Sequence, residues 1–291
     1  MKRALAVVLS SSLLALGCAH GSGKSLSTLT SNSDAVVWEA GKKLLEKKQW
    51  EDARQHFKRI VEGFPQSEHV AEARIGLGDS YFKEGGDANY ILAVSEYRGF
   101  LTLFPSHPRS EYAQFQVARS FDRQRNGPDR DATHTEKALE EYRTLLERYP
   151  TTQYVEETRV RIVDCRQNLA RTEYLVGYFY QHTRRAYRAA LSRYEVLVKD
   201  YPDYARMDEV LFRMAECLKV LGRTAEALPR VTEVLEQYPK SPYVGSARKL
   251  REQLVTTLGS VAPPPVPSPS PSPGASATPP LQGTPGPSPE P

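Results

Sequence analysis

The sequence predicts an all-α fold, a superhelical array of five similar helix pairs closed by a C-terminal capping helix. Three observations support this prediction. An aromatic–proline pair occurs five times, an alanine stands twelve residues before each proline, and a bulky residue stands eight residues before it. The prolines are Pro65, Pro105, Pro150, Pro202 and Pro239. Self-similarity of this kind is the sequence signature of a repeat architecture.

The alanine and the bulky residue mark the second helix of each pair. They are four positions apart and therefore lie on one helical face, where the alanine lets a neighbouring helix approach and the larger side chain fills the space beside it. The proline ends the helix because it lacks an N–H and disfavours the α conformation in the residue before it. These residues are Ala53, Ala93, Ala138, Ala190 and Ala227, followed by Phe57, Tyr97, Tyr142, Tyr194 and Val231.

The first helix of each pair carries a small residue followed three positions later by a large apolar one. A small residue is expected where two helices cross closely. The five small residues, one in each repeat, are Gly41, Gly78, Ala118, Gly177 and Ala215. Together the two helices give the pattern of a tetratricopeptide (TPR) repeat. We predict a TPR-like domain over residues 34–258, with repeats ending near residues 65, 105, 150, 202 and 239 and a cap at residues 244–258.

The repeats are irregular in length. Their prolines are 40, 45, 52 and 37 residues apart, whereas a plain TPR has a period of about 34. The third repeat contains a polar loop, Arg123–Thr135, which lacks the acidic ladder of a calcium loop. The extra residues of the fourth repeat predict one long helix over Tyr154–His182, about 43 Å long, that protrudes from the array. Pro229 falls inside the last repeat's second helix, where it should remove a hydrogen bond or delay the helix start.

The N-terminal residues predict export and lipidation. Residues 1–17 have a basic start and an apolar stretch too short to span a bilayer, and Leu14–Cys18 resembles the lipobox that precedes a lipidated cysteine. An ordinary signal peptide with a chance cysteine is the alternative. Residues 18–33 are polar and rich in Gly and Ser, so we expect a flexible tether after lipidated Cys18. Acyl chains on Cys18 would hold the protein to a membrane.

The C-terminal residues 259–291 predict a disordered tail. Thirteen of the last thirty residues are proline, and Glu290 is the only charged one. Such a segment favours the polyproline II conformation over helix or sheet. It can serve as a spacer or as a ligand for a proline-binding module.

The rest of the sequence indicates no catalytic chemistry. The net charge of +4 includes Lys2 and Arg3 of the signal peptide, and the remaining charges have both signs, so nucleic-acid binding is not expected. No metal-ligand spacing, nucleophile motif or phosphate-binding loop is present, which predicts no enzyme activity, no metal and no cofactor. Cys165 and Cys217 are expected to be buried thiols, with a disulfide as the alternative. Most of the tyrosines should be core, with one or two exposed for protein contacts.

Several of these features together resemble the BamD family, lipoproteins of the outer-membrane β-barrel assembly machinery. They are the lipobox, the five irregular repeats, the DRDxT-type loop, the segment HPRSEYAQFQVA (107–118) and the segment YPTTQYVEETRVRIVDCRQNLARTEYLVGYFY (149–180). The resemblance covers residues 34–243 and does not include the proline-rich tail. It supports the predicted fold.

The resemblance implies a scaffold on the periplasmic face of the outer membrane. Its later repeats would dock on a POTRA domain of a BamA-like β-barrel protein, beside other Bam lipoproteins, and its earlier repeats would receive unfolded outer-membrane proteins. Arg193 is similar to the family position that contacts a POTRA carboxylate, and Tyr187 lies nearby on the same helix. Ala19 is not the aspartate that retains lipoproteins in the inner membrane. The alternative is a TPR adaptor of another envelope system, such as a secretin pilotin or a Tol-associated protein.

Overall fold

The computed structural model describes residues 27–260, and most of these residues are helical. Cys18, the signal peptide and residues 261–291 lie outside the described residues. The helices are α2 (Asp34–Glu46), α3 (Trp50–Gly63), α4 (Val70–Glu84), α5 (Asp87–Leu103), α6 (Ser110–Arg123), α7 (Thr133–Arg148), α8 (Val155–His182), α9 (Tyr187–Asp200), α10 (Met207–Val220), α11 (Thr224–Gln237) and α12 (Val244–Ser260). No strand occurs in this part of the chain.

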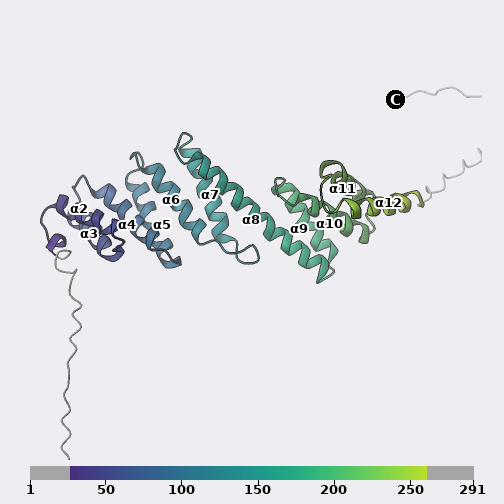
Figure 1. Ribbon diagram of the computed structural model, residues 1–291, viewed down its shortest axis with the longest axis horizontal. Helices are drawn as coiled ribbons and strands as arrows, with labels where there is room; N and C mark the ends of the chain where they lie inside the picture. The colour runs from purple at the N-terminus through teal and green to yellow at the C-terminus, as the bar shows by residue number, and fades with distance from the viewer. Residues whose placement is uncertain (1–26, 261–291) are drawn as a thin grey trace, which may run out of the picture.

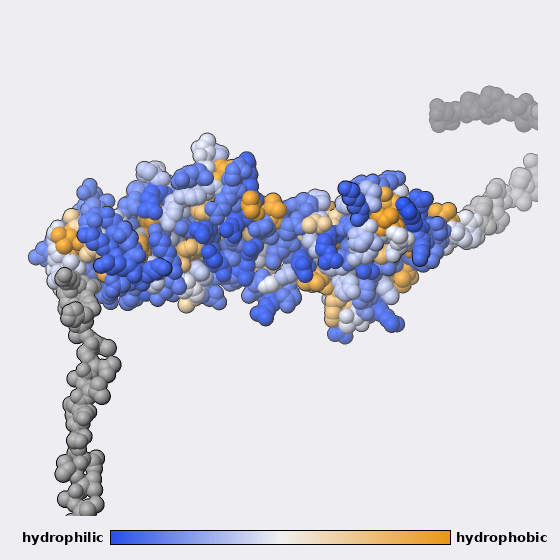
Figure 2. Space-filling view, in the orientation of Figure 1, coloured by the Kyte–Doolittle hydropathy of each residue, from blue (hydrophilic) through white to orange (hydrophobic). Residues whose placement is uncertain are grey.

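The helices form an elongated array in chain order (Figure 1). Each helix packs mainly on the one before it and the one after it, which gives the pairs α2–α3, α4–α5, α6–α7, α8–α9 and α10–α11, followed by α12. The prediction of five helix pairs with a capping helix is confirmed. On the face shown in Figure 2 the surface is mostly hydrophilic, and apolar side chains gather only in small separate patches.

The repeated alanines and aromatic residues form the core, as predicted. All five alanines of the second helices are fully buried, and so are Phe57, Tyr97, Tyr142, Tyr194 and Val231. The aromatic rings of the second helices pack directly against the glycines of the first helices. A Cβ atom placed on Gly78 would lie 2.6 Å from Cε1 of Tyr97, and one on Gly177 would lie 2.6 Å from Cε1 of Tyr194. A larger residue at these glycines would collide with the ring, so the small residue is required for close helix packing.

The buried tyrosines also carry hydrogen bonds that the repeat pattern did not predict. The hydroxyl of Tyr97 donates to Asp79 Oδ1 at 2.7 Å, and that of Tyr194 donates to Gln181 Oε1 at 2.9 Å. In both cases the acceptor lies on the first helix of the same pair. These bonds satisfy polar groups that would otherwise be buried without partners. They explain why tyrosine can replace phenylalanine at this position of the repeat.

The aromatic residue before each proline ends the second helix. Phe64, Phe104, Tyr149, Tyr201 and Tyr238 have φ between −132° and −123° and ψ between 54° and 67°. These angles lie outside the α region, as expected for a residue that precedes proline. Inside α11, Pro229 does not delay the helix, which starts at Thr224. Of the two expected effects, the missing hydrogen bond to the carbonyl of Ala225 is therefore the one that remains.

Helix α8 connects two parts of the molecule and does not protrude, contrary to the expectation from its length. Its first part packs on α7 and its second part on α9. Cys165 and Leu169 belong to one apolar core, whereas Ala170 and Tyr174 belong to the next. The ring of Tyr201 packs against both cores. Each part of α8 has a buried face of its own. The extra helical turns therefore join two apolar cores.

Two predicted segment boundaries differ in the structure. Thr28, in the expected tether, places its hydroxyl 2.9 Å from Nε2 of the fully buried His56. Nδ1 of His56 lies 2.8 Å from the carbonyl of Asp52, so Nε2 is the acceptor and satisfies Thr28. The end of the tether is thus docked on α3. At the other end, Gly259 and Ser260 belong to the predicted tail but are helical, because the first proline that would obstruct α12 is Pro263.

Candidate interaction surfaces

Arg193 lies on the outer side of α9. Its neighbour Tyr194 is fully buried against α8, and consecutive helical residues point about 100° apart, so Arg193 is directed toward solvent. Nη1 of Arg193 lies 3.1 Å from Oε2 of Glu173 on α8, and the two side chains are 46% and 24% exposed. The guanidinium is therefore held in place but still accessible to a second carboxylate.

Tyr187 is the first residue of α9 and is half-buried against the core of the C-terminal part. Six positions separate it from Arg193, which corresponds to about 9 Å along the helix and about 120° around it. The two side chains therefore do not form one continuous stripe. Their role in partner binding stays a prediction, and Cys18, the predicted lipidation site, lies outside the described residues.

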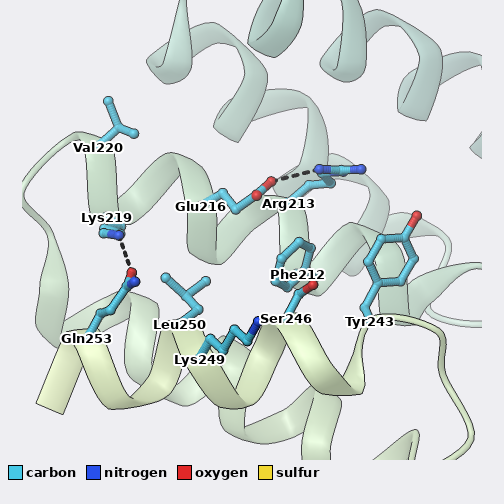
Figure 3. A pocket seen from close by; sticks show the side chains of 10 residues that line it. All are labelled: Phe212, Arg213, Glu216, Lys219, Val220, Tyr243, Ser246, Lys249, Leu250 and Gln253. Carbon is cyan, nitrogen blue, oxygen red and sulfur yellow. Dashed lines mark hydrogen bonds and ion pairs between the residues drawn. The ribbon is translucent and has the colours of Figure 1, made fainter.

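The sequence did not predict an open cavity of about 560 Å³ between α10 and α12. In Figure 3, Phe212 and Leu250 form its apolar floor, while Lys219, Lys249 and Arg213 stand around it. The ring of Phe212 stacks on Tyr243 at a centroid distance of 5.3 Å. The surplus of tyrosines was the only sequence signal for it, since Phe212 and Tyr243 lie outside the alanine, bulky-residue and small-residue columns on which the repeat was predicted.

Arg213 is the central polar residue of this cavity. Its guanidinium donates to Glu216 Oε2 at 2.9 Å and lies 5.5 Å from the ring centroid of Tyr243 and 5.7 Å from that of Tyr178. Burial alone would lower the pKa of Arg213, but Glu216 and nearby groups raise it above its ordinary value. Arg213 thus remains a fixed cation that links α8, α10 and the start of α12.

A buried carboxylate lies behind Arg213. Glu209 is 3% exposed and accepts a hydrogen bond of 2.6 Å from the hydroxyl of Tyr174. Arg206 and Arg213 form ion pairs with it. Burial and the bond to Glu209 raise the pKa of Tyr174 above its ordinary value. The network holds the wall of the cavity in one arrangement, because every member is fixed by at least one other.

The aromatic row that runs from α8 into α9 divides between core and surface. Tyr174 and Tyr194 are buried, whereas Tyr178 is 38% and Phe179 is 43% exposed. The expectation of one or two exposed tyrosines is met by Tyr178, whose ring stacks on His182 at 4.0 Å.

Both cysteines of the described residues are free and buried, so the disulfide alternative is wrong. Cys165 and Cys217 belong to different cores. Burial raises the pKa of Cys165 to about 11 and that of Cys217 to about 12. Between residues 27 and 260, no group of three or more His, Cys, Asp or Glu side chains is placed to hold a metal ion. Over the same residues, no helix has the length and apolar character that crossing a membrane requires.

Comparison with known proteins identifies the family. Residues 30–230 match the model of the family described as Outer membrane lipoprotein (YfiO). The chain belongs to this family. Proteins named "Outer membrane protein assembly factor BamD" are similar to it. The one from Caulobacter vibrioides is 26% identical over 72% of this chain and 68% of its own length, and the one from Rickettsia prowazekii is 26% identical over 74% and 84%. The resemblance to BamD is confirmed.

The YfiO match includes Arg193 and the long helix α8 but ends inside α11. One wall of the α10–α12 cavity, with Tyr243 and Leu250, therefore lies beyond the matched residues. The TPR2AB domain of yeast Sti1 is a similar solved structure, which aligns with 77% of this chain and 84% of its own length at 13% identity and a TM-score of 0.44.

Proposed function

We propose that this protein is a non-catalytic scaffold lipoprotein that acts in the assembly of outer-membrane β-barrel proteins. The observation that carries the proposal is family membership over residues 30–230, together with relatives named for outer-membrane protein assembly. The elongated helical array suits a scaffold, because it offers a long surface to several partners.

The proposed partner surface includes Arg193 on α9. It would dock on a POTRA domain of a BamA-like β-barrel protein, while the earlier repeats receive unfolded outer-membrane proteins and other Bam lipoproteins bind nearby. The Arg193 guanidinium is accessible and positioned by Glu173, and arginine suits ion pairs with carboxylates at interfaces. Tyr187 would contribute part of the surrounding contact area.

The docking test is a charge reversal on α9. We expect Arg193→Glu to abolish co-purification with the BamA-like protein from detergent-solubilised outer membranes, because two carboxylates would then face each other. Arg188→Glu is the matched control, since Arg188 is exposed on the same helix and the change in net charge is identical. Glu173→Gln should leave docking intact or strengthen it, because it frees the guanidinium from its internal partner. Unchanged co-purification of Arg193→Glu, or recovery of a secretin or a Tol component, would contradict the proposal.

The proposed anchor is a set of acyl chains on Cys18, which would place the protein on the periplasmic face of the outer membrane. Mass spectrometry of the N-terminal peptide tests this directly. We expect a mature chain that begins with acylated Cys18, and we expect Cys18→Ser to leave an unprocessed chain that no longer fractionates with outer membranes.

A further inference from the structure

A cavity of about 330 Å³ at the C-terminal end of α6 is surrounded by arginine side chains. It is lined by Arg119, Asp122, Arg123, Arg125 and Arg161, which we call the arginine hollow. Four guanidinium groups thus surround a single carboxylate. We propose that the arginine hollow binds the carboxylate groups of an acidic segment of a partner polypeptide. This interaction goes beyond the proposed docking through Arg193.

The one carboxylate of the hollow is already engaged. Oδ1 of Asp122 lies 2.6 Å from Nε of Arg125, and Oδ2 lies 3.4 Å from Nη1 of Arg161. The hydroxyl of Tyr142 donates to the same Oδ2 at 3.1 Å. The side chain of Asp122 is only 8% exposed, so it forms the base of the hollow. Asp122 neutralises one positive charge and fixes the position of two arginines, and Glu157, outside the lining of the hollow, pairs with Arg161 at 3.5 Å.

The other two arginines have no internal counter-charge. Within residues 27–260, no ion pair joins Arg119 or Arg123 to a carboxylate. The Arg119 guanidinium lies over the rings of Phe82 and Phe115, at 5.0 Å and 5.6 Å from their centroids. Positive charges gathered in this way repel one another, and an anion bound between them removes the repulsion.

Three of the four arginines, Arg119, Arg125 and Arg161, are held in place before any ligand binds. Arg119 is supported by two rings, and Arg125 contacts Asp122 and, at 3.7 Å, the sulfur of Cys165. A guanidinium offers a planar fork that matches a carboxylate in a bidentate arrangement. Because these three side chains are already ordered, binding an oxyanion to them costs little conformational entropy.

Charge complementarity favours an acidic polypeptide segment as the occupant. Arg119 and Arg123 are four positions apart on α6 and so lie on the same side of the helix. Successive acidic residues of an extended segment can pair with both guanidinium groups at once. An inorganic anion or a lipid headgroup would present a single anionic group to them.

The test measures binding of a defined peptide to the full chain purified in detergent. The probe is a fluorescein-labelled peptide in which glutamate alternates with valine, followed by fluorescence anisotropy at low salt. We expect Arg123→Glu to weaken binding at least about tenfold, since it places a carboxylate at the mouth of the hollow. Arg148→Glu is the matched control. Arg148 is exposed at the far end of α7, and the variant has the same net charge. It should change affinity less than about twofold, as expected for a distant exposed charge.

Further arms separate the alternatives. If Arg123→Glu and Arg148→Glu weaken binding equally, the effect is one of overall charge and the proposal is wrong. It is also wrong if the peptide does not bind while inorganic phosphate or phosphatidylglycerol vesicles bind in an Arg123-dependent manner. None of these results depends on whether Arg193 docks on a partner.

Discussion

At the residue scale, the close contact between glycine and aromatic ring sets the packing of each helix pair. Gly78 and Gly177 lie against Tyr97 and Tyr194 so closely that a single added carbon would overlap the ring. The rings are fully buried and their hydroxyls are bonded, so they cannot move aside without losing those bonds. The position therefore tolerates almost no increase in volume.

Gly78→Ala should destabilise the protein by about 1–3 kcal/mol, as overpacking of a full core does. The measurement is the free energy of unfolding in urea. Gly245→Ala in α12 is the control, because a Cβ there meets nothing within 4 Å. The control should be neutral or stabilising by up to about 1 kcal/mol, since alanine is the better helix former. Equal destabilisation by both variants would argue against the packing explanation.

The buried thiol of Cys217 should make stability depend on alkaline pH. Burial raises its pKa from 9.0 to about 12 in the folded protein. The unfolded chain loses this proton at lower pH, so the contribution is fully present below pH 9 and is lost as the pH rises toward 12. We expect the free energy of unfolding to fall less between pH 9 and 11 in Cys217→Ala than in the wild type. Parallel pH profiles would show that the thiol does not remain protonated in the fold.

At the element scale, the helices could be predicted closely from sequence because their ends depend on local chemistry. The five prolines end five helices at the residue expected, and α8 begins within one residue of its predicted start. The joining role of α8 could not be predicted, because it depends on which helices cover Cys165 and Tyr174. The arginine hollow was missed for the same reason. Arg119 and Arg161 are 42 positions apart, and only the packing of α8 on the α6–α7 pair brings them together.

The proline within α11 offers a direct test at this scale. Pro229 is exposed and leaves the carbonyl of Ala225 without its helical partner. Pro229→Ala should stabilise the protein by about 1–2 kcal/mol, because the restored bond outweighs the greater freedom of the unfolded chain. The melting temperature measures this effect. Pro105→Ala, outside any helix, should not raise it, and a lower melting temperature for Pro229→Ala would show that the proline itself is favourable in α11.

At the scale of the whole molecule, three apolar cores follow one another along the array, and α8 contributes to two of them. Neighbouring helices supply nearly all contacts, so stability should be distributed locally. This arrangement differs from a globular domain, in which a single core joins distant parts of the chain.

A substitution that destabilises the last core should therefore affect only the C-terminal part of the array. Leu254 of α12 is 1% exposed, and Leu254→Ala should cost about 2–5 kcal/mol through loss of packing and a residual cavity. Hydrogen exchange read out by mass spectrometry should speed up in α10–α12 and stay unchanged in α3–α5. Faster exchange throughout the array would show that the cores unfold as one unit.

The division of α8 between two cores also has a consequence for how the chain acquires its structure when it emerges N-terminus first. The middle core takes its buried residues from the chain up to Leu169, so it can form almost completely once the first half of α8 is available. The last core needs Leu254, near the end of the described chain, and must wait. Tyr201 joins the two cores only after α9 has been made. The second half of α8 is thus displayed for a time as an unpaired apolar face, which is the stage at which a chaperone would have most to bind.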